Sequence, residues 1–294
     1  MAEQKQTIKP LKPYKSIEEQ IKILEERHCV ISDTSLAKET LSKINYYRFS
    51  AYFLPFKDNN GMYLSGTTFE RVFHIYEFDR ELRSLLFQAI ECIEVTLRTR
   101  IARTHVKNCN RNPISYLNPK NFNRSTKVTK FQEKIKEIIS NNKDSPIIKH
   151  HNDSYGGKLP LWVVIEFFTF GMLSRFYSNL KIKDKNEIAK QYQTNHENLK
   201  SWLHCCSVVR NICAHGERLY CRTFSAVPKG FNPKEKVSNS LWAMMLVIKS
   251  LYPFPDKWEK EFMPQLENIM DKYSKDIDLK HLGFPKNWKE ELMN

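Results

Sequence analysis

The segment YEFDRELRSLLFQAIECIEVTLRTRIA, residues 76–102, gives the clearest indication of the fold class. Its apolar residues recur at spacings of three and four, which predicts an amphipathic helix, and the pattern extends over residues 69–106. Leu85, Ile90 and Ile93 belong to the apolar side that would pack on a core. A helix of this kind makes an α-helical domain the first expectation.

The same periodicity continues along most of the chain, and only 8 glycines interrupt it. We therefore predict an all-α protein and disfavour enzymes built on a parallel sheet. The predicted helices cover residues 16–28, 34–54, 69–106, 128–141, 159–180, 184–193, 196–222, 234–252 and 255–274. Stretches rich in Asn, Pro, Ser and Gly predict loops at 57–66, 108–126, 150–158 and 228–233.

These breaks predict three parts of the chain. They are an N-terminal helical extension (1–66), a helical core (67–225) with an inserted segment at about 108–158, and a C-terminal helical region (226–294). The chain's length allows one elaborated domain or two small ones, each with a sizeable core.

Cysteine use and hydropathy indicate a cytoplasmic protein. The 7 cysteines occur singly or as the pair Cys205-Cys206 and never as C-x-x-C, a pattern typical of reduced thiols rather than of disulfide frameworks or zinc ribbons. No apolar run reaches the length of a membrane span, and no apolar segment follows the N-terminal lysines. We therefore expect neither secretion nor membrane insertion.

The charge balance indicates a polyanionic partner. Lys and Arg number 47 against 33 Asp and Glu, a formal net charge of +14. A surplus of this size attracts nucleic acid, which is the first candidate partner. The alternative is that the charge only serves solubility, since Lys far outnumbers Arg. Charge alone does not separate the two.

Two predicted helices carry ionisable residues on one side. On the helix at 69–106, the residues Glu91, Glu94, Arg98 and His105 share a face. A solvated face with a Glu94–Arg98 pair at i,i+4 explains that pattern equally well. On the helix at 196–222, an apolar seam contains Trp202, Leu203, Cys206, Val209 and Cys213, and a polar stripe contains Asn211, His215, Arg218 and Arg222. Gly216 is expected to loosen or end that helix.

Arg210 precedes His215 by five positions, and its long side chain can reach the same region as the polar stripe. The R-x4-H spacing is weak by itself, because Arg100 and His105 share it. The context of Arg210 and His215, namely Asn211, Ala214, Arg218 and Tyr220, favours this pair as the functional one. Zinc binding by the nearby cysteines and histidines is disfavoured, because Cys206 and Cys213 fit the apolar seam. We predict no metal and no cofactor.

The segment RNICAHGERLYCR (210–222) resembles the signature of abortive-infection proteins of the AbiD/AbiF type, which belong to the HEPN superfamily. Further segments that look like this family, in order and spacing, are YYRFSAYFLPF (46–56), residues 76–102, LPLWVVIEFFTFGMLSRFY (159–177) and HLGFPKNW (281–288). The resemblance implies a HEPN-type helical bundle with N-terminal and C-terminal extensions. It also implies a role in bacterial phage defence and, often, ribonuclease activity.

The resemblance also implies roles for single residues. Arg210 and His215 match the catalytic pair, and Asn211 matches the polar residue after the Arg. Glu94 and Arg98 match a supporting pair, with Glu91 beside them. Independently of the resemblance, the residues expected to bind RNA are Arg218, Arg222, Tyr220 and His105. Because HEPN relatives commonly pair two motifs, a homodimer is expected.

Two functions remain open from the sequence. The first is a metal-independent endoribonuclease of abortive infection, in which His215 transfers protons and Arg210 stabilises phosphate charge. The second is a non-catalytic RNA-binding protein, regulated by or assembled with a structured RNA. Cleavage that resists a metal chelator and leaves a 2',3'-cyclic phosphate would favour the first.

Overall fold

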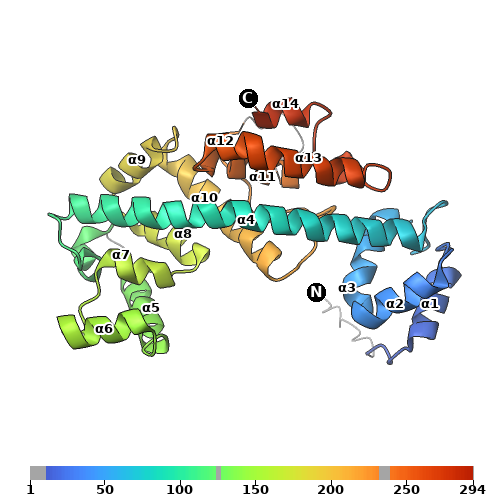
Figure 1. Ribbon diagram of the computed structural model, residues 1–294, viewed down its shortest axis with the longest axis horizontal. Coiled ribbons are helices and arrows are strands. Elements are labelled where there is room, and N and C mark those ends of the chain that lie inside the picture. Colours follow the sequence, from blue (N-terminus) through green and yellow to red (C-terminus); the bar gives the residue numbers. More distant parts are fainter. Residues whose placement is uncertain (1–10, 124–126, 232–238, 294) are drawn as a thin grey trace, which may run out of the picture. The chain divides into compact units, whose positions relative to one another are not determined.

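The computed structural model describes residues 11–123, 127–231 and 239–293 (Figure 1). Regular structure in these ranges is helical, and β-type pairing is confined to isolated bridges. The all-α prediction is confirmed. No helix in the described part of the chain is both long and apolar enough to cross a membrane.

The α-helices are α1 (Ile17–Glu26), α2 (Thr34–Lys43), α3 (Tyr46–Ser50), α4 (Phe69–Asn108), α5 (Lys127–Asn141), α6 (Pro146–Tyr155), α7 (Leu161–Val164), α8 (Phe170–Asn179), α9 (Ile182–Lys190), α10 (His196–Ala214), α11 (Leu241–Leu251), α12 (Pro255–Lys257), α13 (Met263–Lys272) and α14 (Trp288–Met293). The short 3-10 helices are η1 (Ala51–Phe56), η2 (Ser115–Leu117), η3 (Pro119–Asn121), η4 (Ile165–Phe167) and η6 (Leu279–His281). A π-helical turn, η5 (Trp258–Phe262), joins α12 to α13.

Two predicted helices are broken by capping residues. The helix predicted at 34–54 is α2, α3 and η1, because Asn45 leaves the helical conformation and its side chain accepts a hydrogen bond from the Tyr47 N–H at 2.8 Å. The helix predicted at 159–180 is α7, η4 and α8, where Thr169 caps α8 by accepting from the Met172 N–H. Periodicity continues across such breaks, so it did not reveal them.

The loop predicted at 150–158 is wrong for most of its length, because α6 covers Pro146–Tyr155. Pro146 starts the helix at a position where no backbone N–H is needed. Gly156, with a φ of 58°, then ends it in the left-handed conformation. The glycine pair thus marks the end of a helix. The first part of the helix predicted at 234–252 and the end of the loop predicted at 228–233 lie outside the described residues, and α11 begins at Leu241.

The chain divides into two compact units, Met1–Phe78 and Asp79–Asn294. The three-part division predicted above stays a prediction. The first unit packs around an aromatic cluster of Phe49, Phe53, Tyr63 and Phe69, all of them buried. Burying such side chains contributes roughly 1.5–3 kcal/mol each to folding.

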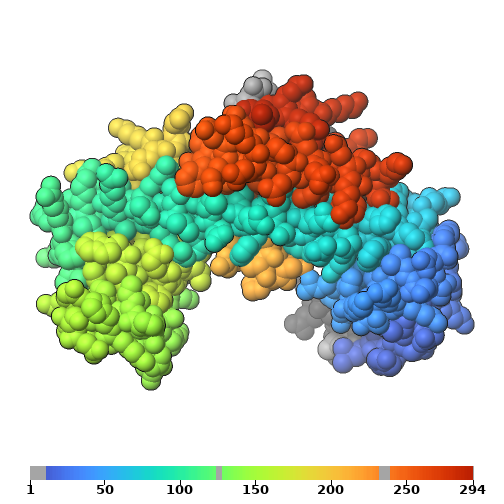
Figure 2. Space-filling model, viewed as in Figure 1, coloured from blue at the N-terminus to red at the C-terminus, as the bar shows by residue number. Residues whose placement is uncertain are grey.

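The second unit is built around α10, which packs against α8, α9 and α11 (Figure 1). Leu203, Cys206 and Val209 of the predicted apolar seam are buried, which is why this side of α10 faces the core. Figure 2 shows the C-terminal segment, in orange and red, on one side of the part of α4 that belongs to this unit. There Glu81 of α4 accepts hydrogen bonds from Lys272 at 2.7 Å and from Tyr273 at 2.9 Å.

Candidate active site at the end of α10

The helix α10 begins at a conventional cap and ends at the R-x4-H motif. Asn195 caps its start by accepting from the N–H of Asn198 at 2.9 Å. At its end, the Gly216 N–H donates to the Cys213 carbonyl at 3.1 Å and the Glu217 N–H to the Ile212 carbonyl at 2.9 Å. These two bonds, with Gly216 at a φ of 63°, form a Schellman motif.

The helix predicted at 196–222 therefore ends at Ala214, and His215 is its C-cap. The polar stripe predicted on that helix is wrong beyond His215, because Arg218 and Arg222 lie in the irregular segment that follows. The physical reason is local: glycine adopts the left-handed conformation at no steric cost, and this lets the chain turn away. Asn211 and His215 remain neighbours on the last turn.

Glu94 of α4 lies between two arginines. Its Oε1 is 2.6 Å from Arg98 Nη2, and its Oε2 is 3.8 Å from Arg210 Nε of α10. Arg98 also donates to the Phe168 carbonyl at 2.9 Å and forms an ion pair with Glu166 at 3.5 Å. The pair inferred from the sequence thus exists, and it connects directly to the arginine of the R-x4-H motif.

Burial controls the electrostatics of this cluster. Glu94 is only 7% exposed, and burial raises the pKa of its carboxyl group although Arg98 and Arg210 act in the opposite direction. The nearby charges of Glu91 and Glu166 raise that pKa further. The two guanidinium groups therefore offset part of the effect of burial on the pKa of Glu94. Glu91 itself is exposed and has no hydrogen-bond or ion-pair partner among the described residues.

The side chains of Asn211 and His215 are both exposed. In the part of the chain that the structure describes, neither side chain has a hydrogen-bond partner. The His215 N–H donates to the Asn211 carbonyl at 2.9 Å, so the two backbones are linked while the side chains stay accessible. An amide and an imidazole presented in this way can bind a ligand from solvent.

A buried carboxylate fixes the segment after His215. Asp79 of α4, which is completely buried, accepts from the N–H of Tyr220 at 2.7 Å and from the N–H of Leu219 at 3.1 Å. Arg83 forms an ion pair with Asp79 and donates to the Glu217 carbonyl at 3.4 Å. Sequence reasoning missed both residues. Their i,i+4 spacing on an otherwise apolar face was the signal that could have found them.

The predicted RNA-binding residues after His215 differ in accessibility. Tyr220 is fully buried, and its hydroxyl lies 2.8 Å from His281 Nδ1 and accepts from the Asp278 N–H at 3.0 Å. Its prediction as an RNA contact is therefore wrong: the side chain anchors the C-terminal region. Arg222 is half-buried and pairs with Glu217 at 3.0 Å. For Arg222 and for Arg218, which is also half-buried, RNA binding stays a prediction.

His105 is also in the interior. Its side chain is completely buried, its Nδ1 lies 3.0 Å from Asp184 of α9, and its ring stacks on Phe122. The prediction of His105 as an RNA contact is corrected, because its ring connects α4 to α9. The competing R-x4-H pair, Arg100 and His105, thus lacks an accessible imidazole.

Comparison with known proteins identifies the class of this chain. A family model described as Abi-like protein matches residues 39–221, more than half of the sequence and all of the segments that hold Glu94, Arg210 and His215. The chain therefore belongs to the Abi-like family. This membership links it to abortive infection, a form of phage defence. No curated protein and no solved structure gave a significant match.

Proposed function

We propose that this protein is a metal-independent endoribonuclease of the HEPN type that acts in abortive infection. The observation that carries the proposal is that Arg210 lies against the buried Glu94 and that His215, five positions later, is exposed at the capped end of α10. The net charge of +14 supports RNA as the substrate.

The proposed reaction transfers protons at two oxygens. An imidazole of His215 takes the proton of an RNA 2'-hydroxyl, the 2'-oxygen bonds to the adjacent phosphorus, and the bond from phosphorus to the 5'-oxygen breaks. A second imidazole donates a proton to the departing 5'-oxygen. The products are a 2',3'-cyclic phosphate and a free 5'-hydroxyl. Imidazole suits both steps because it accepts and donates protons near neutral pH.

Arg210 supplies the positive charge for the phosphorane. A guanidinium stays protonated and can contact two phosphate oxygens at once. Glu94 limits the orientations available to Arg210, while Arg98 balances the carboxylate so that Arg210 is not fully neutralised. The amide of Asn211 can hold a phosphate oxygen or the imidazole.

The test is cleavage of a labelled RNA by purified protein in the presence of EDTA, with the 3' ends of the products analysed. His215→Ala and Arg210→Ala should each lower the rate at least about 100-fold. His204→Ala is the matched control, because His204 is an exposed histidine on the same helix. His105→Ala, an obvious control from the sequence, is unsuitable because that ring is buried.

Retention of the wild-type cleavage rate by a His215→Ala protein that melts normally would overturn the catalytic assignment. It would favour the second candidate, a non-catalytic RNA-binding protein regulated by or assembled with a structured RNA. The basic charge of the chain favours that candidate equally. In that case the protein should bind RNA with an affinity that falls steeply with salt, without cleaving it.

A further inference from the structure

A groove made of two cavities that share Trp162 begins along the C-terminal half of α4 and continues beyond the end of that helix. Its first part is an open cavity of about 450 Å3 lined by Arg98, Thr99, Ala102, Arg103, Val106, Lys107, Arg111, Trp162, Ile165 and Glu166. Its second part, of about 630 Å3, shares Trp162 and is bordered by the loop after α4, by residues of α6 such as Tyr155, and by the loop after α6, which contains Lys158. We call these two cavities together the Trp162 groove.

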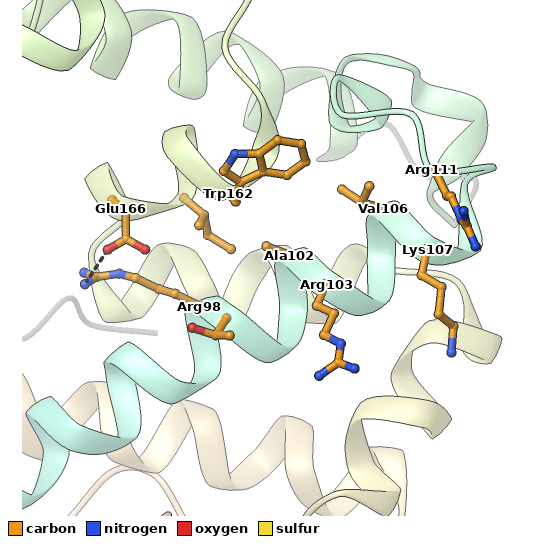
Figure 3. A pocket seen from close by; sticks show the side chains of 10 residues that line it. Arg98, Ala102, Arg103, Val106, Lys107, Arg111, Trp162 and Glu166 are labelled. Atoms are coloured by element: carbon orange, nitrogen blue, oxygen red, sulfur yellow. Dashed lines mark ion pairs between the residues drawn. The ribbon is translucent and has the colours of Figure 1, made fainter.

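The floor of the groove carries exposed aromatic surface. Trp162, at the start of α7, is 53% exposed, and Tyr155 of α6 is 57% exposed. Figure 3 shows the indole ring of Trp162 on the same side of α4 as Ala102 and Val106. The indole N–H has no hydrogen-bond partner among the described residues. Flat rings left open to solvent in a concave site are suited to stacking with another planar group.

The rim of the groove is cationic. Arg98, Arg103, Lys107 and Arg111 line the first cavity, and the acidic side chain there, Glu166, is already paired with Arg98 at 3.5 Å. Lys107 is paired with Glu187 of α9 at 2.5 Å. In the described residues, Arg103 and Arg111 have no ion-pair or hydrogen-bond partner for their guanidinium groups. These two cations are thus free to bind an anion at the edge of the groove, and Figure 3 shows that the Arg103 side chain extends from the side of α4 opposite to Trp162.

Arg111 is held in an unusual conformation. Its φ is 58°, in the left-handed region that non-glycine residues rarely adopt, and its N–H donates to the Val106 carbonyl at 2.9 Å. The left-handed turn that ends α4 therefore places an arginine, rather than a glycine, at the far end of the cavity (Figure 3). A strained residue whose side chain has no partner in the fold is consistent with a binding role.

One residue of the candidate active site also lines the groove. Arg98 lines the first cavity and at the same time forms the ion pair with Glu94, which in turn contacts Arg210. From Arg98 to Asn108, the last residue of α4, the helix axis extends by about 15 Å at 1.5 Å per residue, and Arg111 lies beyond that end. A single mononucleotide would not fill that length.

We propose that the Trp162 groove binds single-stranded RNA and directs the strand towards Arg210 and His215. A base stacks on the indole of Trp162, while Arg103 and Arg111 contact phosphate groups. An acidic peptide would satisfy the cations but would leave the aromatic floor without a planar partner, so the combination favours a nucleic acid strand. This inference rests on the proposed function and names the path by which its substrate enters.

The test is binding of a fluorescent single-stranded oligoribonucleotide, measured by anisotropy on the His215→Ala protein so that cleavage does not interfere. Trp162→Ala should weaken binding between about 5-fold and 150-fold, and Trp162→Phe should restore most of it. The matched control is Phe254→Ala, which removes another exposed ring. The double variant Arg103→Gln/Arg111→Gln should weaken binding more than Lys275→Gln/Lys286→Gln, which removes the same charge from exposed positions elsewhere.

Three results would overturn the inference. One is equal binding by the Trp162→Ala and Phe254→Ala proteins. Another is a duplex of equal length that binds as tightly as the single strand, which would indicate recognition of phosphates alone. The third is a mononucleotide that binds the groove while the oligonucleotide fails to compete. None of these outcomes depends on whether His215 is catalytic, since failure of the proposed function would appear only in the cleavage assay.

Discussion

At the scale of single residues, Glu94 is the centre of the candidate site. The sequence predicted its pairing with Arg98, and the structure shows that one of its oxygens faces Arg98 and the other faces Arg210. The two contacts differ in length, 2.6 Å to Arg98 and 3.8 Å to Arg210. Arg98 is therefore the firmly bound partner, and Arg210 is the one with freedom to reach a phosphate.

Replacing Glu94 by Gln should lower RNA cleavage by about 10- to 100-fold, because Arg210 loses the charge that limits its orientations. The measurement is the single-turnover cleavage rate of protein shown to be folded by circular dichroism. Glu91→Gln is the control, since Glu91 is an exposed carboxylate one turn away without an arginine contact. Equal rates for the two variants would show that Glu94 does not position Arg210.

Asp79 and Arg83 support the site through the segment after His215. Asp79→Ala should lower the free energy of unfolding by about 3–5 kcal/mol, because it leaves the buried Arg83 without its ion pair and two backbone N–H groups without an acceptor. Urea unfolding would measure this. Asp256→Ala, at a side chain that is 89% exposed, should change the same quantity by no more than about 0.5 kcal/mol. A loss below 1 kcal/mol for Asp79→Ala would contradict the assigned role.

At the scale of elements, the end of α10 decides where His215 lies. The Schellman motif stops the helix at Ala214, so His215 lies at the edge of the helix and the chain can turn back towards Asp79. Had the helix continued to residue 222, the N–H groups of Leu219 and Tyr220 would form hydrogen bonds within the helix. They would then be unavailable to the Asp79 carboxylate.

Gly216→Ala should therefore affect both stability and activity. An alanine at a φ of 63° costs about 1 kcal/mol, and relief of that strain would move His215. Gly61→Ala is a matched control, because Gly61 has a φ of 83° and lies in the first unit. Thermal melting should show similar destabilisation for both variants, whereas only Gly216→Ala should lose cleavage activity. Full activity in folded Gly216→Ala protein would argue against the need for this helix end.

At the scale of the whole molecule, one chain holds a single accessible R-x4-H motif. The second match in the sequence ends at His105, which is buried. The proposed reaction uses one imidazole as base and another as acid, so a single exposed His215 leaves it incomplete. A symmetric dimer would place two copies of the motif in one cleft.

Light scattering should accordingly give a mass near twice 34.9 kDa at micromolar concentration, at least when RNA is present. Mixing wild-type protein with an excess of His215→Ala protein offers a second test. In a shared site a mixed dimer holds one His215 where the reaction uses two, so the excess variant should lower the activity of the wild-type protein. If the wild-type protein cleaved RNA but had the mass of a single chain under every condition, the active site would not be shared between two chains.

Local sequence patterns determined much of this protein. The three- and four-residue spacing predicted α4 and α10, because amphipathic periodicity depends only on neighbouring residues. The pair Glu94 and Arg98 at i,i+4 and the segment around Arg210 and His215 were found in the same way. The resemblance to abortive-infection proteins agreed with the family model that matches residues 39–221.

The tertiary structure decided which of these side chains can act. Tyr220 and His105 have polar groups that look available in the sequence, yet contacts with His281 and Asp184 bury them. Asp79 reaches the N–H of Tyr220, 141 positions away, so no local pattern could reveal that contact. Periodicity reports the conformation of a segment, whereas accessibility depends on which distant segments fold against it.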